Sequence, residues 1–220
     1  LFKQIKSLLD SKGIQNAGQF LVFGQKVITE LLRRGHFKAL GWIRTADHPS
    51  VPSGANLGIQ DVVFARDRFR EIDVVGTNHP ILWCTEPNVN AGNTFSFAAG
   101  CHVLLPLQNP DNLGAAIRTA AALGARSVGL TKTSANPFLP RSVRAAGTAI
   151  FGVPLWRIND IVDAQSLGMP IVTLDKMGED LRQFTFPSKF LLAVGTEGPG
   201  LPREFRQQSE ILFPVSIPIE

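Results

Sequence analysis

Two segments of this 220-residue chain combine residue types whose chemistry suits catalysis. The first, residues 109–119, reads NPDNLGAAIRT and places Asn112 six residues before Arg118. A guanidinium presents a rigid fork of donors that suits an oxyanion such as phosphate. Asn112 is suited to cap the helix that follows, and we expect both residues near the start of that helix. From spacing alone, a capped helix with a solvated Arg118 is an equally good interpretation.

The second segment, residues 195–201, reads GTEGPGL and directly follows an apolar run. Its three glycines indicate a backbone that adopts positive φ angles or passes close to a ligand. The spacing differs from the GxGxxG of dinucleotide-binding folds, and no Lys-Ser/Thr pair follows as in a P-loop. The segment encloses Glu197, whose charge must be solvated, paired or used in chemistry. A third segment, IPIE at residues 217–220, indicates nothing by itself.

The elements around these segments predict where they lie. In the second half of the chain, apolar runs alternate with helical stretches, which is typical of a parallel sheet with helices on both faces. Open sheets of this kind bind ligands at the carboxyl ends of their strands. We expect a strand before each segment, at residues 102–107 and 190–194. The other expected strands are 127–130, 155–156, 171–174 and 211–213, and the expected helices are 112–123, 141–149, 158–167 and 202–208.

The first 90 residues predict a smaller α/β domain. Apolar residues at 27, 28, 31 and 32 recur at helical spacing among charged ones. Residues 87–97 are rich in turn-forming and polar residues, which favours a domain boundary there. We therefore expect domains at 1–90 and 100–220, with a linker at 91–99. The expected strands of the first domain are 21–23, 40–43 and 61–64, with a short helix at 67–72.

The composition, 44% hydrophobic and 18% charged, is that of a globular protein. No apolar stretch reaches the roughly 18 residues of a membrane span, and the first residues lack the features of a signal peptide. Cys84 and Cys101 are too few for a disulfide framework, so we expect free thiols in a reducing cytoplasm. The histidines show no metal-binding spacing, and we expect no metal. A net charge of +4 permits an anionic partner.

The segments NPDNLGAAIRTA, AVGTEGPGL and IPIE, in this order, resemble the three signature motifs of the SpoU (TrmH-like) family of SPOUT RNA methyltransferases. The resemblance covers residues 100–220, and the N-terminal domain resembles the L30e-like substrate-binding domain of several members. It implies a small L30e-like α/β domain followed by a trefoil-knotted α/β domain with a parallel sheet. It also implies methyl transfer from S-adenosylmethionine to a ribose 2′-hydroxyl of RNA, with ribosomal RNA favoured over transfer RNA, by a homodimer that completes each site across its interface.

The resemblance further implies which residues form the site. Asn112, Arg118 and Glu197 match the catalytic positions of the family. A guanidinium holds its proton firmly, so we expect Arg118 to grip the phosphate beside the target ribose and to stabilise charge developing on the hydroxyl. The cofactor would lie against Leu174, Gly195, Thr196, Gly198, Gly200, Ile217 and Pro218. The basic side chains expected at the RNA backbone are Lys26, Arg33, Arg34, Arg141 and Arg144, for each of which an ordinary solvated charge is the alternative.

The chain departs from the family pattern at its end. The third motif of the family continues with a Ser-Leu-Asn segment and a helix, whereas this sequence stops at Glu220. We expect truncation or disorder rather than a lost site, and we also expect trimming before Leu1. The main alternative function is a catalytically inactive RNA-binding or ribosome-associated module on the same fold. Base methylation and a nucleotide-dependent oxidoreductase remain as weaker alternatives, the latter disfavoured because no GxGxxG follows any strand.

Overall fold

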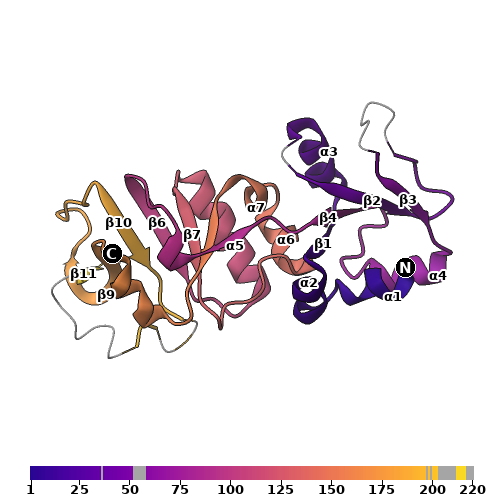
Figure 1. Cartoon of the computed structure of the whole chain (residues 1–220). Helices are drawn as coiled ribbons and strands as arrows, with labels where there is room; N and C mark the ends of the chain where they lie inside the picture. Colours follow the sequence, from indigo (N-terminus) through magenta and orange to yellow (C-terminus); the bar gives the residue numbers. More distant parts are fainter. Residues whose placement is uncertain (36, 52–57, 197, 199, 203–211, 217–220) are drawn as a thin grey trace. The chain divides into compact units, whose positions relative to one another are not determined.

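The computed structural model of the chain describes residues 1–35, 37–51, 58–196, 198, 200–202 and 212–216 (Figure 1). They belong to two compact units. One unit comprises residues 1–87 and 136–151, and the other comprises residues 88–135 and 152–220. None of the helices in the described residues has the length and hydrophobicity needed to cross a membrane.

The first unit is built around a mixed four-stranded sheet in the order β1-β4-β2-β3. The central strand β4 (Ile81–Thr85) is antiparallel to both β1 (Gln19–Val22) and β2 (Ala39–Arg44). The edge strand β3 (Gln60–Val63) is parallel to β2. Three of these strands are confirmed predictions. β4, with the sequence ILWCT, was not predicted.

Four helices alternate with these strands along the first 72 residues. The core of the unit joins Ile5 of the first helix and Phe69 of the fourth to Leu21, Ile43 and Ile81 of the sheet. The first two helices, of 6 and 7 residues, were not predicted. The helices are α1 (Phe2–Ser7), α2 (Ser11–Ala17), α3 (Gln25–Arg34) and α4 (Arg66–Ile72).

A segment from the middle of the chain, Asn136–Phe151, also belongs to the first unit. The ring of Phe138 lies 5.0 Å from that of Phe20 on β1, and the ring of Phe151 lies 5.7 Å from it. The helix predicted at 141–149 is in fact two helices, α6 (Pro140–Ala146) and α7 (Ala149–Gly152). Gly147 separates them, because its φ of 59° and ψ of −139° cannot continue a helix.

The second unit contains a seven-stranded sheet within the described residues, in the order β11-β9-β10-β6-β7-β8-β5, and every pairing in it is parallel. The predicted α/β class with a parallel sheet is confirmed, and helix α5 (Pro110–Ala122) packs on β6 and β7 (Figure 1). The strands are β5 (Val89–Ala91), β6 (Gly100–Leu105), β7 (Ser127–Leu130), β8 (Leu155–Arg157), β9 (Ile171–Asp180), β10 (Lys189–Ala193) and β11 (Leu212–Ser216).

Four expectations for the second unit are not confirmed by the structure. The expected linker at 91–99 contains the end of β5 and a 3-10 turn, η1 (Gly92–Thr94). The helix expected at 158–167 is a 3-10 helix, η2 (Ile161–Leu167), which begins at a capping box formed by Asp160 and Asp163. The helix expected at 202–208 falls almost wholly outside the described residues, and the trefoil knot stays a prediction.

A hydrogen-bonded network fixes the middle of this sheet. The indole Nε1 of the fully buried Trp156 donates to Ser127 Oγ at 2.8 Å, and Ser127 Oγ lies 2.6 Å from His102 Nδ1. His102 Nε2 lies 2.9 Å from the Ala98 carbonyl, which can only accept, so Nε2 carries the proton and Nδ1 accepts from the serine. The network makes His102 a structural residue that links three elements of the unit.

Gly129 of β7 leaves the space that the Trp156 ring occupies, because a Cβ at Gly129 would lie 2.3 Å from that ring. We therefore predict that Gly129→Ala lowers the free energy of unfolding by about 1–3 kcal/mol through overpacking. Gly152→Ala is the matched control: a Cβ there meets nothing within 4 Å, so stability should stay equal or rise. Thermal unfolding followed by circular dichroism compares the two, and equal melting temperatures would contradict this packing.

Candidate functional site

The two segments with candidate chemistry leave neighbouring strands at the same edge of the parallel sheet. β10 pairs with β6 so that Ala193 lies opposite Leu104, and the Val194 amide donates to the Leu104 carbonyl at 3.2 Å. The glycine segment therefore begins beside the residues that lead into α5. On the other side of β10, Thr173 of β9 lies opposite Ala193, which brings Leu174 to the same edge. The pairings thus unite the segments that the sequence analysis selected.

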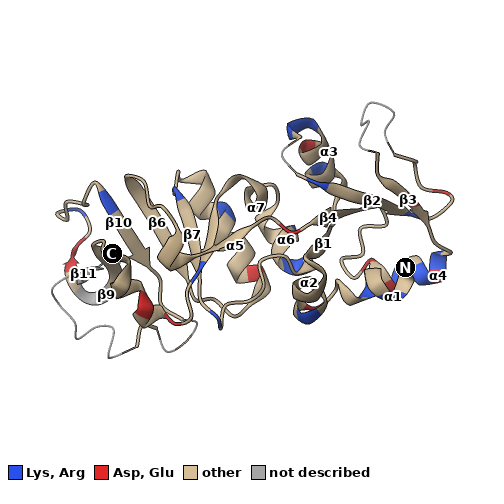
Figure 2. Cartoon of the chain, viewed as in Figure 1, with Lys and Arg blue, Asp and Glu red and all other residues tan. Residues whose placement is uncertain are grey.

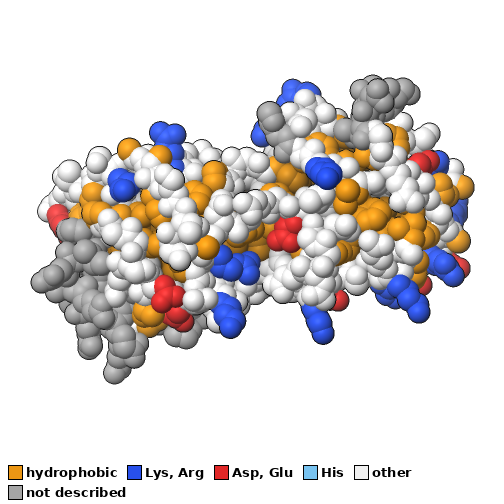
Figure 3. Space-filling model, viewed as in Figure 1, with side chains coloured by type: hydrophobic (Ala, Val, Ile, Leu, Met, Phe, Trp, Pro, Cys, Tyr) orange, Lys and Arg blue, Asp and Glu red, His pale blue; other side chains and the backbone are white. Residues whose placement is uncertain are grey.

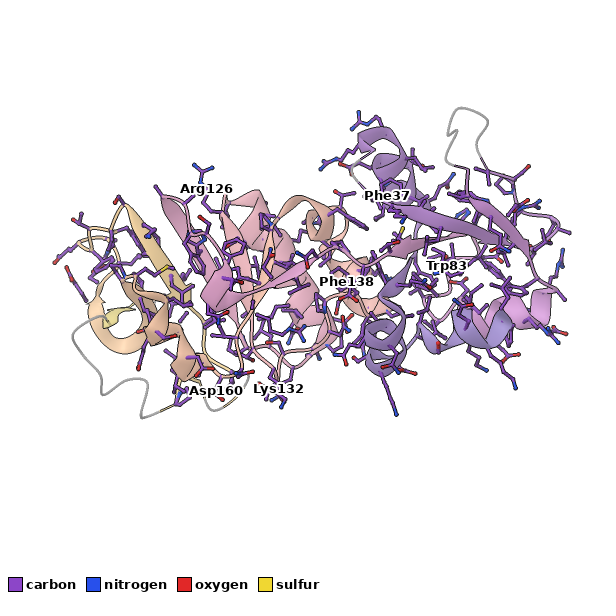
Figure 4. All side chains as sticks on the ribbon, viewed as in Figure 1. Phe37, Trp83, Arg126, Lys132, Phe138 and Asp160 are labelled. Atoms are coloured by element: carbon purple, nitrogen blue, oxygen red, sulfur yellow. The ribbon has the colours of Figure 1, made fainter. Side chains whose placement is uncertain are left out.

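Figure 4 shows this edge through two labelled side chains. Lys132, which follows β7, and Asp160, which follows β8, lie near each other, whereas Arg126, which precedes β7, points from the opposite edge. The loop after β7 is held to β6: the Thr131 amide donates to Ser134 Oγ at 2.9 Å, and this hydroxyl donates to the Leu105 carbonyl at 2.8 Å. The exposed Lys132 is thus a cation at the carboxyl edge. Lys132 was not predicted as a site residue, although its place just after the correctly predicted strand at 127–130 could have indicated one.

The glycine segment forms a closed hairpin. The Thr196 amide donates to the Gly200 carbonyl at 3.1 Å, and the Gly200 amide donates to the Thr196 carbonyl at the same distance. Thr196 Oγ1 donates to the Gly200 carbonyl as well, at 2.8 Å. The two ends of the hairpin are therefore fixed to each other at the edge of the sheet.

Two different structural requirements explain the glycines of this hairpin. A Cβ at Gly195 would lie 2.8 Å from Gly200 Cα, so close contact between the two ends of the loop requires glycine there. Gly198 and Gly200 have φ angles of 92° and 74°, which L side chains rarely adopt. Closure of the loop thus explains the three glycines, whereas the sequence analysis also allowed approach to a ligand. Glu197, Ile217 and Pro218 lie outside the described residues.

Helix α5 begins differently from the expectation. Its N-cap is Asn109, whose side chain accepts from the amides of Asp111 at 2.9 Å and Asn112 at 3.4 Å. Pro110 takes the first helical position, which suits its fixed φ and missing donor. The prediction that Asn112 caps the helix is therefore wrong. Asn112 is instead the third helical residue, with an exposed side chain close to the carboxyl edge.

Arg118 lies farther from this edge than expected. It follows Pro110 by eight residues in α5, which at the rise of an α-helix places it about 12 Å along the axis. The prediction that both residues lie near the helix start therefore holds for Asn112 and is wrong for Arg118. The Arg118 side chain is exposed, and within the described residues it forms no hydrogen bond or ion pair. It belongs to an exposed face of α5 that includes Ala115, Thr119 and Ala122.

The five basic side chains expected to contact RNA all lie on the first unit. Lys26, Arg33 and Arg34 are exposed on α3, where Figure 2 shows a group of Lys and Arg residues. Arg34 forms an ion pair with Glu30 four residues earlier. Arg141 and Arg144 are exposed on α6. Their accessibility is compatible with contact to an anion, and their role stays a prediction.

The two cysteines are free thiols. Burial raises the pKa of Cys84 and of Cys101, so neither is poised to form a thiolate nucleophile at neutral pH. Among the described residues, no group of three His, Cys, Asp or Glu side chains is placed to hold a metal ion. The side chains near the carboxyl edge include amides, hydroxyls and the cation Lys132, which can orient a substrate and stabilise an oxyanion.

Comparison with known proteins gives consistent matches. The model of the SpoU rRNA Methylase family matches residues 101–220. Ribosomal RNA small subunit methyltransferase G 2 of Syntrophobacter fumaroxidans is 37% identical over 210 residues, which cover 95% of this chain but only 42% of that protein. The 23S rRNA (guanosine(2553)-2′-O)-methyltransferase RlmP of Bacillus subtilis is 28% identical over 218 residues, which cover 95% of this chain and 84% of that protein.

The fold is also that of a solved structure. The AdoMet-bound rRNA methyltransferase from Sinorhizobium meliloti matches 100% of this chain and 85% of its own with a TM-score of 0.81, at 23% sequence identity. The match extends over both units of the chain. It shows the α/β fold of each unit.

The Gly195–Gly200 contact yields a local prediction. Gly195→Ala should force the ends of the hairpin apart and speed amide hydrogen exchange at Thr196 and Gly200 by about tenfold or more, since each 1.4 kcal/mol changes an equilibrium tenfold. Thr196→Val is the milder comparison, because it removes one side-chain hydrogen bond and keeps both backbone bonds. Exchange measured by mass spectrometry after short labelling distinguishes the two. Unchanged exchange in Gly195→Ala would show that the loop does not require glycine.

Proposed function

This chain belongs to the SpoU rRNA methylase family, and we propose that it transfers a methyl group from S-adenosylmethionine to a ribose 2′-hydroxyl of ribosomal RNA. The observation that carries the proposal is the register of β10 and β6, which brings the glycine hairpin and the start of α5 together. The name of the Bacillus subtilis relative supports ribose over base and ribosomal over transfer RNA. The exposed Asn112 and Arg118 support an enzyme over an inactive binding module.

The carboxyl edge fits a cofactor that needs both an apolar surface and a shaped backbone. Leu174, beside the hairpin, exposes 44% of its area, although it follows a buried strand segment. We infer that it contacts the cofactor together with Gly195, Thr196, Gly198 and Gly200, with Ile217 and Pro218 completing the pocket. S-adenosylmethionine, when bound, supplies a methyl group on a sulfonium, whose thioether is a good leaving group.

The side chains of α5 would act on the RNA. Arg118 grips the phosphate next to the target ribose and stabilises the negative charge that develops on the hydroxyl oxygen as its proton leaves to water. Asn112, at the first turn of α5, orients the nucleotide, and Glu197 accepts a hydrogen bond from this network. Holding the hydroxyl in line with the methyl group supplies much of the rate enhancement, since positioning alone contributes about 7–11 kcal/mol.

The distance along α5 supports a site completed by a second copy of the chain. Arg118 lies about 12 Å along α5 from the helix start, so its backbone is set back from the edge of the sheet at which the glycine hairpin begins. Its neighbours on the exposed face of α5 are small, and Leu123 at the end of the helix exposes 82% of its area. Small side chains around Arg118 and an exposed leucine at the helix end suit packing against a twin helix in a homodimer. Arg118 of one protomer would then act at the hairpin of its partner.

RNA recognition is assigned in this proposal to an L30e-like domain at residues 1–90, separated by residues 91–99 from a methyltransferase domain at 100–220. Deletion of the first domain is a poor test, because Phe138 and Phe151 would lose their packing against Phe20. Point substitutions of the exposed α3 and α6 cations avoid this loss. We place the protein in the cytoplasm, whose reducing conditions suit its free thiols.

Arg118→Ala should lower methyl transfer to ribosomal RNA by about 10²–10³-fold while S-adenosylmethionine binding stays unchanged, because Arg118 acts on the RNA and not on the cofactor. Arg126→Ala is the matched control, because it removes one exposed arginine at the opposite edge of the sheet (Figure 4). Turnover with radiolabelled cofactor and calorimetric binding measure the two effects. Near wild-type turnover of Arg118→Ala would remove Arg118 from the mechanism.

Mixed dimers test whether Arg118 acts across the interface. Gly195→Val places a branched side chain against Gly200 and should abolish cofactor binding, so this variant and Arg118→Ala are both inactive alone. A dimer with one chain of each kind keeps one intact site only if Arg118 serves its partner. We expect co-refolding of the two variants to restore about a quarter of wild-type turnover, by random pairing of protomers. No recovery in dimers shown to be mixed would place Arg118 at the site of its own chain.

A further inference from the structure

A polar hollow of about 220 Å³ opens on the first unit, outside the cations that the sequence analysis selected. Its lining comes from three places in the chain: the segment after β2, helix α4 and the loop after α4. The residues that line it are Thr45, Asp47, Arg66, Phe69, Arg70 and Asn78.

The floor of the hollow contains a polar group without a partner. Thr45 is only 4% exposed, and among the described residues its Oγ1 has no hydrogen-bond partner. The nearby Thr45 hydroxyl lowers the pKa of the Asp47 carboxyl. The geometry between Thr45 Oγ1 and this carboxyl is not that of a hydrogen bond. A buried hydroxyl without a partner is unfavourable, and a ligand that enters the hollow can satisfy it.

The rim of the hollow is cationic. Arg66 and Arg70 are four residues apart on α4, so they share one face, and their side chains are 70% and 78% exposed. Figure 3 shows Lys and Arg side chains gathered over α1 and α4. Arg66 pairs with Asp47 at 3.1 Å, while Arg70 has only a 3.9 Å contact with Asp67. Arg70 is therefore available to a phosphate, and the exposed guanidinium of Arg66 keeps further donors beside its bond to Asp47.

Asn78, which also lines the hollow, is held in a defined conformation. Asn78 has a φ of 50°, the single positive φ of a non-glycine residue in the described chain. The carboxylate of Asp73 fixes it by accepting from the Asn78 amide at 2.7 Å and from the Thr77 amide at 3.1 Å. The side-chain amide of Asn78 therefore lines the hollow from a rigid loop and offers both a donor and an acceptor.

We propose that this hollow binds one unpaired nucleotide of the RNA substrate, with the base edge at Thr45, Asp47 and Asn78 and the phosphate at Arg66 and Arg70. The inference rests on the proposed function in taking RNA as the substrate. Donors and acceptors inside the hollow suit the mixed edge of a base, and the carboxylate of Asp47 disfavours a phosphate at the same depth. Stacking occurs on the arginine planes, because Phe69 is only 2% exposed and faces His48.

Binding of a fluorescent 12-nucleotide single-stranded RNA to the full chain, followed by anisotropy across a salt series, tests the proposal. Arg66→Gln with Arg70→Gln should weaken binding by about tenfold or more and reduce the slope of log affinity against log salt by about 1.4, the value for two phosphate contacts to a single strand. Lys3→Ala with Lys12→Ala removes the same two charges from exposed positions outside the hollow and should have a smaller effect.

Thr45→Val separates the pocket from simple charge attraction. It keeps the shape of the side chain and removes the unpartnered hydroxyl, so the melting temperature should stay equal or rise while RNA affinity falls about threefold to tenfold. Wild-type affinity in Thr45→Val, or equal losses in the arginine and lysine pairs, would overturn the pocket while leaving methyl transfer intact. A wild-type chain that binds no RNA also overturns it, and methyl transfer to ribosomal RNA then shows whether the proposed function fails with it.

Discussion

The parallel pairing of β10 with β6 is the constraint on which the candidate site depends. A shift of this pairing by one residue would move the glycine hairpin relative to the start of α5 and turn each side chain of the strand to the other face of the sheet. The register is secured by buried apolar side chains such as Leu104 and Ala193 and by the hydrogen bond that continues from Val194 to Leu104. The chemistry proposed at the edge is therefore determined by packing within the sheet.

The interior next to this pair of strands is equally specific. Trp156 can occupy its place only because β7 carries glycine at position 129, and its indole is satisfied by a serine that also orients His102. The network extends from β8 through β7 to β6, so it fixes the strands on one side of the site. The hairpin at residues 195–200 and the anchored loop after β7 then present backbone and side chains from a rigid base.

The sequence predicted the parallel sheet and the two segments that meet at its edge, because buried parallel strands are near-continuous apolar runs and their ends are marked by polar or glycine-rich loops. It failed where local signals are weak or misleading. Asn112 resembles a helix cap, but Asn109 and Pro110 start the helix three residues earlier, and this shift also moves Arg118 away from the edge. The attachment of residues 136–151 to the first unit depends on contacts such as Phe138 with Phe20, which no local pattern encodes. Thr45 and Asn78 lie 33 positions apart in the sequence, so their shared hollow was equally invisible.

Identification of the methylated nucleoside is the most direct test of the proposed reaction. Ribosomal RNA incubated with the full chain and S-adenosylmethionine can be digested to nucleosides and analysed by liquid chromatography with mass spectrometry. The geometry of the carboxyl edge and the family of the chain predict one added methyl group on ribose, seen as a 2′-O-methylated nucleoside. A methyl group on a base, or the absence of any methylated product, would contradict the central claim.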